Sequence, residues 1–529
     1  MRTINDWPAL ADKGTPIVCL EHYSTDLTRI LSQFYSWGQE RGMPVYFWNP
    51  GFRAMQQVVE IGGKCIWQNT ENVPDKDVLQ FLLEKGETGL YILGGLLDVD
   101  EIGSVSERLA FGLTNAYYQS KWATVRQYWV LLGSFVVLPT QLQPLIPVLS
   151  CPLPGREQVR NIVADFVRSN PWLGGKDDLA TQNSLVRACQ GLPWGEIELV
   201  LERGLSFAAS CDEMARLVLA HKVDKLRGQG LEFISEPDVS DAGGLDLLDE
   251  SLNKVSALLD PQAAEKYKLK FPKGMVLWGP PGTGKSLSAK LAAKKMGIPL
   301  LTADWGAVLG APRPDQALRS LLEIAQALSP TVLYWDDFDK GFAGWDSNAD
   351  GGVSRRLSGK LLTWMQENQS PIYVVATVNR LGMLPPELIR RFDDIFFVDL
   401  PHAGAMYDIF NLHLAKYFPQ FRDCQVSPWT DDQWRILLRD YHICTPAEIA
   451  NAVRKTAEDI YYRNKLQGIE PDELQITLND LRQQRFNFTP SMIRDEDQIL
   501  SIRNRATYAR PASGADRSRF ALPPQALFE

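Results

Sequence analysis

Short apolar runs recur along this chain, and helix-length segments separate them. In the first half the runs are Ile17–Leu20, Val45–Trp48, Leu90–Leu93 and Trp129–Leu132. In the second half they are Met275–Trp278, Val332–Trp335, Tyr373–Thr377 and Ile395–Val398. Short apolar runs that alternate with helix-length segments are typical of βα units and a parallel sheet. The pattern therefore predicts an α/β organisation in both halves.

The two halves also share a layout near the end of each predicted sheet. In the second half, Leu384-Pro385 precedes a short helical segment, a strand and then Leu400-Pro401. Leu138-Pro139 and Leu153-Pro154 hold the corresponding places in the first half. A recurring layout indicates an internal repeat. We interpret the first half as a degenerate copy of the second, with an unrelated α/β domain as the alternative.

The run Met275–Trp278 leads into a glycine-rich segment with a phosphate-binding pattern. The segment consists of Gly279, Pro280, Pro281, Gly282, Thr283, Gly284, Lys285 and Ser286, and a helix-forming stretch starts at Leu287. It fits G-x-x-x-x-G-K-[ST] between a strand and a helix. Backbone N–H groups of such a loop face phosphates, and the helix N-terminus adds a favourable dipole. We expect ATP here, with Lys285 at the β- and γ-phosphates and the Ser286 hydroxyl on Mg²⁺.

Acidic residues follow the apolar run Val332–Trp335. Asp336 is expected to hold Mg²⁺ through its water shell, and Asp337 to deprotonate the attacking water. Strand alternation puts Asp339 on the same side as Asp337, so Asp339 stays open as the alternative base. The next run ends at Asn379, a polar side chain placed to touch the γ-phosphate or that water.

Arg390 and Arg391 precede the last of the four apolar runs. An arginine held at a neighbouring subunit's γ-phosphate neutralises charge that develops in the transition state. Taken alone, such a pair would more often be part of a solvated loop. Both arginines are candidate catalytic residues because of the motifs that accompany them.

Together these motifs resemble the AAA family of ring-forming ATPases over about residues 240 to 460. The resemblance implies a homo-oligomer, a hexameric ring in that family, with Arg390 as the better arginine finger and Arg391 as the second. Gly243–Asp246 is similar to the family's Gly-Gly-Leu segment near the base, which implies Gly244 and Leu245 as nucleotide contacts. Thr445–Ile449 is similar to the Gly-Ala-Asp segment of the family's lid, and Ala447 is the one residue carried over.

A narrower resemblance extends over nearly the whole chain. Thr15–Leu20 and Val45–Trp48 resemble the uncharacterised AAA-domain proteins of cyanobacteria and red-algal plastids. Three later segments, Asp350–Arg356, Leu362–Glu367 and Arg494–Ser513, are similar to the same group. The resemblance implies a soluble ATPase from a photosynthetic lineage, and it does not specify a client.

Two positions depart from the AAA pattern. The catalytic Glu of the family is Asp337 here, one methylene shorter, which places the base roughly 1–1.5 Å farther from an unadjusted water. The pore segment Asp304–Asp315 lacks the aromatic-hydrophobic-Gly tripeptide with which threading ATPases grip a polypeptide. Its nearest aromatic, Trp305, stands where we expect packing at a strand end. Both departures put peptide threading and fast hydrolysis in doubt.

Composition limits the alternatives. The chain has 529 residues, 45% hydrophobic content and a net charge of −9, which argues against a dedicated nucleic-acid surface. Its seven cysteines form no C-x-x-C pair and its five histidines no H-E-x-x-H motif, so we expect buried free thiols and no zinc protease. No secretory signal opens the chain, and its longest apolar stretch is about half a bilayer span. We expect a cytoplasmic or plastid-stromal protein.

These signals predict five segments. They are a degenerate α/β N-terminal domain (1–154), a helical segment and linker (155–235), an AAA ATPase core (236–401), a helical lid (402–487) and a C-terminal extension, partly disordered (488–529). The segment Glu21–Thr25, at the place of the phosphate loop in the first half, has no glycine or lysine and cannot cradle a phosphate in the same way.

The sequence favours an AAA ATPase that binds and hydrolyses ATP to remodel or regulate a protein partner. The alternative is an ATP-binding scaffold with slow or no hydrolysis, which Asp337 and the missing pore aromatic favour. A nucleic-acid motor is a distant third, because no strongly basic stripe occurs.

Overall fold

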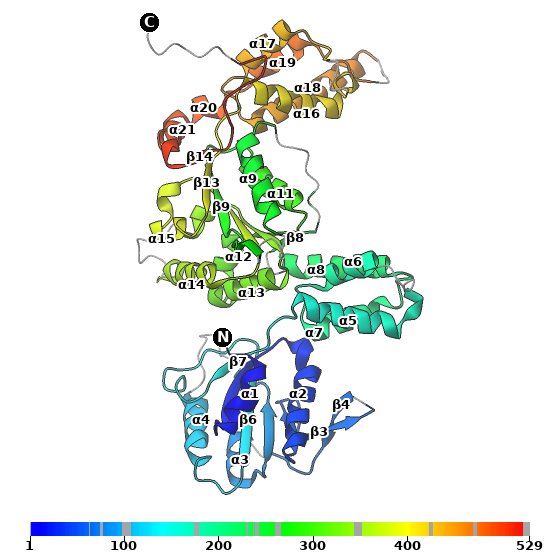
Figure 1. The fold of residues 1–529 in the computed structure, drawn as a ribbon, viewed down its shortest axis with the longest axis vertical. Coiled ribbons are helices and arrows are strands. Elements are labelled where there is room, and N and C mark those ends of the chain that lie inside the picture. Colours follow the sequence, from blue (N-terminus) through cyan, green and yellow to red (C-terminus); the bar gives the residue numbers. More distant parts are fainter. Residues whose placement is uncertain are drawn as a thin grey trace. The chain divides into compact units, whose positions relative to one another are not determined.

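The computed structural model describes residues 2–62, 64–74, 78–97, 107–173, 179–228, 231–235, 237, 243–259, 266–342, 352–422, 427–468 and 473–521. The chain forms two compact units, residues 1–222 and 223–529. Each unit contains one largely parallel sheet with helices on its faces, followed by a group of helices (Figure 1). The α/β class predicted from the apolar runs is confirmed.

The sheet of the first unit has the strand order β4-β3-β2-β5-β6-β1-β7. Strands β7, β1, β6, β5 and β2 are parallel, and β3 and β4 form an antiparallel hairpin at the β2 edge. The strands are β1 (Ile17–Glu21), β2 (Val45–Trp48), β3 (Gln56–Ile61), β4 (Lys64–Asn69), β5 (Gly89–Leu93), β6 (Gln127–Gly133) and β7 (Val148–Ser150). Helices α1 (Trp7–Asp12), α2 (Leu27–Glu40), α3 (Val78–Lys85) and α4 (Glu107–Gln119) flank them.

The sheet of the second unit has the order β14-β13-β9-β12-β11-β10-β8. All neighbours are parallel except β8, which pairs antiparallel with β10. The strands are β8 (Glu232–Ile234), β9 (Gly274–Trp278), β10 (Leu300–Ala303), β11 (Thr331–Trp335), β12 (Ile372–Val378), β13 (Asp394–Phe397) and β14 (Arg510–Pro511). The helices between them are α9 (Asp246–Ala257), α11 (Lys285–Met296), α12 (Trp305–Gly310), α13 (Pro314–Ala327), α14 (Val353–Glu367) and α15 (Pro386–Ile389).

The five central strands follow the same order in both units. Counted along the chain, β7-β1-β6-β5-β2 and β13-β9-β12-β11-β10 both run fifth, first, fourth, third, second. The first strand thus lies between the fourth and fifth strands in each unit. This shared topology agrees with the interpretation of the first half as a degenerate copy of the second, because an unrelated α/β domain has no reason to repeat it.

Each unit continues into helices with a core of their own. In the first unit these are α5 (Arg156–Ser169), α6 (Leu179–Cys189), α7 (Trp194–Gly204) and α8 (Cys211–Gly228), packed around residues such as Val159 and Ile197. In the second they are α16 (Ala403–Tyr417), α17 (Asp431–Asp440), α18 (Pro446–Leu466) and α19 (Leu478–Phe486), packed around Trp434. The short helices α20 (Ser491–Arg494) and α21 (Glu496–Arg503) follow.

The C-terminal extension, predicted from the sequence to be partly disordered, is held against the rest of its unit as far as Ala521. Strand β14 pairs with β13, and the backbone of Ala512 accepts a hydrogen bond from Leu248 N at 3.1 Å. Farther along, Phe520 is buried in the core of the lid helices. The polar composition hid this order, because two buried side chains and backbone hydrogen bonds fix a segment that is otherwise polar. Residues 522–529 lie outside the described residues.

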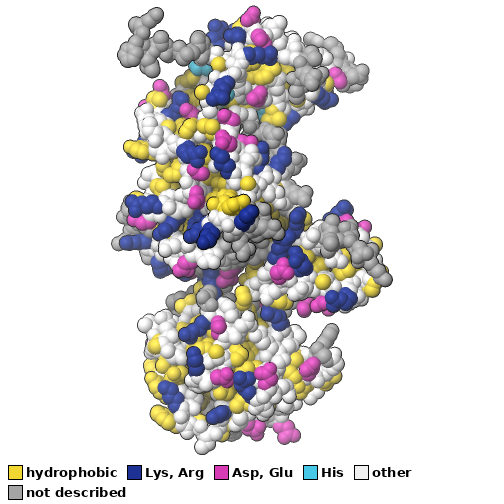
Figure 2. Space-filling view, in the orientation of Figure 1, with side chains coloured by type: hydrophobic (Ala, Val, Ile, Leu, Met, Phe, Trp, Pro, Cys, Tyr) yellow, Lys and Arg dark blue, Asp and Glu magenta, His cyan; other side chains and the backbone are white. Residues whose placement is uncertain are grey.

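Six of the seven cysteines are buried free thiols, as expected, and Cys424 lies outside the described residues. Among the helices that the structure describes, none combines the length and apolar character that a bilayer crossing requires. Acidic and basic side chains are interspersed over the visible face, consistent with a net charge of −9 (Figure 2).

Candidate nucleotide-binding site

The loop between β9 and α11 has the backbone shape that a phosphate requires. Gly282 and Gly284 adopt φ values of +80° and +100°, a region that residues with a Cβ rarely occupy. A Cβ on Gly279 would lie 2.1 Å from Val398 O, so this position needs glycine for space. Helix α11 begins at Lys285 with no side-chain cap, which leaves its first N–H groups available to an anion.

Lys285 lies buried within this loop. Its Nζ donates hydrogen bonds to Gly279 O at 2.7 Å and to Pro280 O at 2.9 Å. Burial lowers the pKa of Lys285 to about 8, against the opposing charges of Asp337, Asp336 and Asp339. The ammonium is therefore held by carbonyl groups that a phosphate can replace.

Asp336 stands at the end of β11 with its carboxylate fixed by three donors. Its Oδ1 accepts hydrogen bonds from Tyr334 Oη and Thr377 Oγ1, both at 2.7 Å, and from Asp337 N at 3.1 Å. No described residue donates to Oδ2. A fixed carboxylate with one open oxygen, near the hydroxyl of Ser286, is an oxygen donor set that suits Mg²⁺.

Asp337 and Asn379 are brought together, as expected from the sequence. Asn379 Nδ2 donates to Asp337 Oδ1 at 2.7 Å, and Lys340 Nζ lies 2.6 Å from Asp337 Oδ2. The backbone of Asp337 has a φ of +45°, unusual for a residue with a side chain, and its N–H donates to Thr377 Oγ1 at 3.1 Å. A strained, hydrogen-bonded turn therefore aims this carboxylate.

Asp339, the alternative base, is buried and occupied. Its Oδ1 accepts from Asn379 N at 3.3 Å, and its Oδ2 accepts from Arg380 N at 3.2 Å. Both oxygens thus hold the backbone that carries Asn379. This arrangement favours Asp337 as the group open to water.

The two arginines have different surroundings. The Arg390 side chain, at the end of α15, is exposed and makes no hydrogen bond or ion pair with any described residue. Arg391 is half-buried, and its Nε lacks a hydrogen-bond acceptor among the described residues. Burial and the charge of Arg391 lower the pKa of neighbouring Lys273. Arg391 therefore packs against its own sheet, whereas Arg390 is available to a second molecule.

The lid helices contribute the remaining predicted contacts. Ala447 N, in the first turn of α18, donates to Gly282 O at 3.2 Å, which joins the lid to the phosphate loop. Gly244 has a φ of +78° and packs against Ala405 of α16. A Cβ on Gly244 would lie 2.2 Å from the Cβ of Ala405. Leu245 is buried beside α9, and Leu287 lies half-buried in α11.

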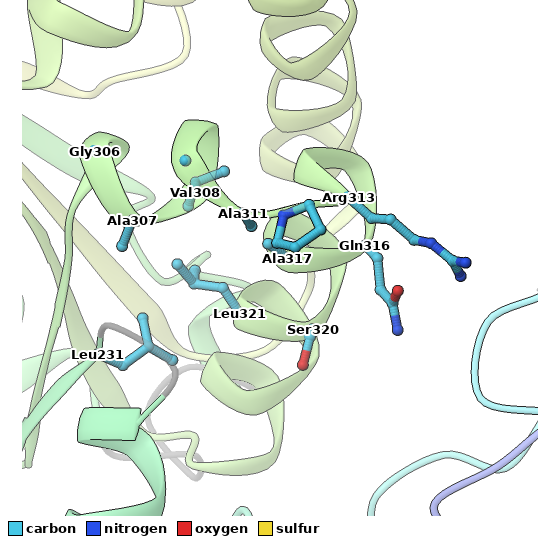
Figure 3. Close-up of a pocket in the computed structure, with 12 residues that line it drawn as sticks. Leu231, Gly306, Ala307, Val308, Ala311, Arg313, Gln316, Ala317, Ser320 and Leu321 are labelled. Atoms are coloured by element: carbon cyan, nitrogen blue, oxygen red, sulfur yellow. The ribbon is translucent and has the colours of Figure 1, made fainter. Parts of the chain in front are cut away.

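The pore segment borders a cavity of about 760 Å³ (Figure 3). Its lining includes the apolar side chains of Ala307, Val308 and Leu321 and the polar side chains of Arg313 and Gln316. Trp305 is 2% exposed and its ring lies 4.6 Å from that of Trp335, so it packs in the core as expected. Among the described residues, no aromatic side chain of this segment is exposed.

Sequence reasoning missed three residues of the site. Tyr334 and Thr377 hold Asp336, and Lys340 pairs with Asp337. One signal was present for Tyr334: it precedes Asp336 by two positions, and residues two apart share a face of a strand. No sequence signal marked Lys340, because only the turn after β11 brings its side chain next to Asp337.

A comparison with family models gives a direct match. Residues 275–400 match the ATPase family associated with various cellular activities (AAA). This region is an AAA domain.

Curated relatives extend the match beyond the AAA domain. The chain is homologous to the uncharacterised AAA domain-containing protein ycf46 of Guillardia theta, with 33% identity over 343 residues, 64% of this chain and 66% of the relative. The ycf46 protein of Pyropia yezoensis is 29% identical over 72% of this chain and 74% of its own length. That of Trieres chinensis is 35% identical over 55% and 59%. The chain thus covers less than two thirds of the first and third relatives. The predicted resemblance to uncharacterised AAA-domain proteins is confirmed, over 55–72% of this chain in these three matches.

Proposed function

We propose that residues 223–529 bind ATP with Mg²⁺ and hydrolyse it. The observation that carries this proposal is the hydrogen bond between Asn379 and Asp337, next to a buried Lys285 and an oriented Asp336. These side chains follow two neighbouring parallel strands, β11 and β12, or begin α11, the helix after the third strand, β9. Their convergence on one loop with an uncapped helix N-terminus fits phosphoryl chemistry.

Each residue has a distinct task in this proposal. Lys285 leaves the loop carbonyls and pairs with the phosphate oxygens, so its ammonium bonds an anion in place of two neutral acceptors. Ser286 and Asp336 would hold Mg²⁺, which neutralises charge on the phosphates when bound. Asp337 accepts the proton of the attacking water, and Asn379 keeps the carboxylate aimed.

The test is Lys285→Ala, which removes the ammonium from the loop and leaves the apolar side chains of the core unchanged. We expect ATP affinity, measured by calorimetry, to fall by at least ~10-fold while the circular dichroism spectrum and melting temperature stay near wild type. Equal affinity in both proteins would remove the site from consideration.

We further propose that the protein works as a homo-oligomer on a protein partner. The exposed Arg390 supports a subunit interface, because an arginine without a partner among the described residues can reach a neighbour's γ-phosphate. Ring formation is the usual state of AAA ATPases and comes to this chain as part of the proposal.

A second candidate is an ATP-binding scaffold that hydrolyses slowly. Two observations favour it: Asp337 replaces the longer Glu of the family, and the pore segment presents no exposed aromatic among its described residues. A steady-state ATPase assay together with a size measurement, with and without ATP, distinguishes the two candidates.

A further inference from the structure

A buried tyrosine lies directly beneath the candidate magnesium site. Tyr334 is 4% exposed and belongs to the apolar cluster between the sheet and α11, with Val332, Ala289 and Ala292. Its ring fills the layer where an aliphatic side chain would serve equally well for packing. The hydroxyl is therefore the feature that packing alone does not explain.

That hydroxyl joins the two predicted metal ligands. Tyr334 Oη donates to Asp336 Oδ1 at 2.7 Å, and the Ser286 side chain lies within hydrogen-bonding reach of the Tyr334 hydroxyl. One phenol on β11 thus contacts the ligand from α11 and the ligand from its own strand.

The resulting hydrogen-bond pattern leaves a defined opening. Tyr334, Thr377 and the Asp337 N–H all donate to the same oxygen of Asp336, and the other oxygen has no donor among the described residues. A carboxylate held through one oxygen cannot rotate freely. Groups that hold a metal ligand in this way tune the affinity of the site for the metal.

We propose that Tyr334 is a positioning residue that sets Ser286 and Asp336 at matching places for Mg²⁺ before the nucleotide arrives. The inference rests on the proposed ATP site and adds a residue that acts through two ligands. It concerns the metal-dependent part of nucleotide affinity, because the phenol contacts neither Lys285 nor the loop carbonyls in the described hydrogen bonds.

The test compares Tyr334→Phe with a matched control, Tyr373→Phe. Tyr373 is 1% exposed, lies on neighbouring β12 and belongs to the same apolar cluster, but no hydroxyl partner is recorded for it. The readout is the affinity for a fluorescent ATP analogue, measured in EDTA and across a Mg²⁺ titration. Hydrolysis across the same titration is a second readout.

For Tyr334→Phe we expect the affinity for the ATP analogue in EDTA to stay within about twofold of wild type. The Mg²⁺ concentration that gives half of the Mg²⁺-dependent gain in affinity should rise by roughly 10-fold. Tyr373→Phe should match wild type in both. An unchanged Mg²⁺ dependence in Tyr334→Phe, or an equal loss with and without Mg²⁺, would overturn the inference. Lys285→Ala run in parallel separates the two claims: if it loses binding while Tyr334→Phe behaves like wild type, the ATP site stands and the role of Tyr334 falls.

Discussion

At the scale of single residues, the carboxylates of the β11 turn have divided tasks. Asp336 is fixed through one oxygen, Asp337 is aimed by Asn379, and Asp339 holds the backbone of Asn379. The sequence predicted the first two roles from spacing. The sequence did not distinguish Asp337 from Asp339 as the base. Strand alternation predicts the same side for both residues, but the chain turns after β11 and this turn buries Asp339.

The first prediction concerns Asp337. Asp337→Asn should reduce single-turnover hydrolysis by at least ~100-fold and trap ATP, because an amide does not accept the water's proton. Asp337→Glu should preserve or raise the rate, since its longer side chain restores the reach of the family's Glu. Lys340→Ala serves as the control: the ion pair is largely exposed, so its loss should change the rate by less than about threefold. Hydrolysis by Asp337→Asn at the wild-type rate would contradict the assignment of the base.

The second prediction concerns the proton on Lys285. Its pKa of about 8 means that, between about pH 8 and 9, much of the nucleotide-free protein carries a neutral amine. Phosphate charge favours the ammonium and raises this pKa, so ATP binding should take up protons in that window and almost none near pH 6.5. Calorimetry in two buffers of different ionisation enthalpy measures the uptake. Lys285→Arg, always charged, should abolish it, and persistence of the uptake in this variant would point to another group.

At the scale of elements, the C-terminal segment connects the sheet to the lid helices of its unit. Ser513 Oγ donates to Gly244 O, Gly514 N donates to Asp246 Oδ1 at 2.8 Å, and Asp516 Oδ2 accepts from Gly404 N at 3.1 Å. The segment thus touches the Gly-Gly-Leu region and α16 in succession.

The third prediction tests this connection at its far end. Phe520 is 5% exposed, and its ring lies 4.9 Å from that of Tyr407. Phe520→Ala should destabilise the second unit by about 3 kcal/mol, because it removes a buried aromatic ring. Phe486→Ala is the matched control, since Phe486 lies in α19 with 79% exposure and should shift stability by less than about 0.5 kcal/mol. Urea unfolding followed by tryptophan fluorescence compares them, and equal midpoints would show that the segment is not seated.

The elements themselves were largely predictable. Apolar runs located the central strands of both sheets, because a strand that is buried on both faces is uniformly apolar. The recurring Leu-Pro turns indicated the repeat. The edge strands were not predictable. Strand β8 is three residues long and β14 is two, so their places depend on hydrogen bonds to β10 and β13 rather than on a pattern of their own.

At the scale of the whole molecule, the proposed assembly depends on an arginine that its own chain does not use. The sequence predicted Arg390 and Arg391 as a pair, and their surroundings differ because Arg391 is half-buried whereas Arg390 is exposed. Packing decides which of the two adjacent arginines is exposed. The sequence gives no signal for this difference, because the two side chains are the same.

The fourth prediction is that Arg390→Ala binds ATP normally but hydrolyses it at least ~100-fold more slowly. Mixing it with Lys285→Ala should recover part of the activity. In a mixed interface, the Arg390→Ala subunit supplies an intact nucleotide site and the Lys285→Ala subunit supplies an intact arginine. Arg391→Ala is the control and should lose less activity. No recovery at any mixing ratio, with co-assembly confirmed by size, would argue against action in trans.

The first unit contains a contact that sets it apart from the second. At the N-terminus of α7, Gly195 N donates to Asp26 Oδ1 at 2.8 Å, and a Cβ on Gly195 would lie 1.9 Å from Thr25 O. In the second unit, the lid helix α18 meets the phosphate loop through a backbone hydrogen bond from Ala447 N to Gly282 O. In the first unit, by contrast, a side-chain carboxyl contacts the N-terminus of α7.

A side-chain carboxyl is part of the chain and is always present at its helix end, whereas a ligand is present only as its concentration allows. Ligand stabilisation grows as RT ln(1 + [L]/Kd) and applies only to the unit that binds. If the second unit binds ATP as proposed, its stability rises with the ATP concentration. The contact between Asp26 and Gly195 adds to the stability of the first unit at any ATP concentration.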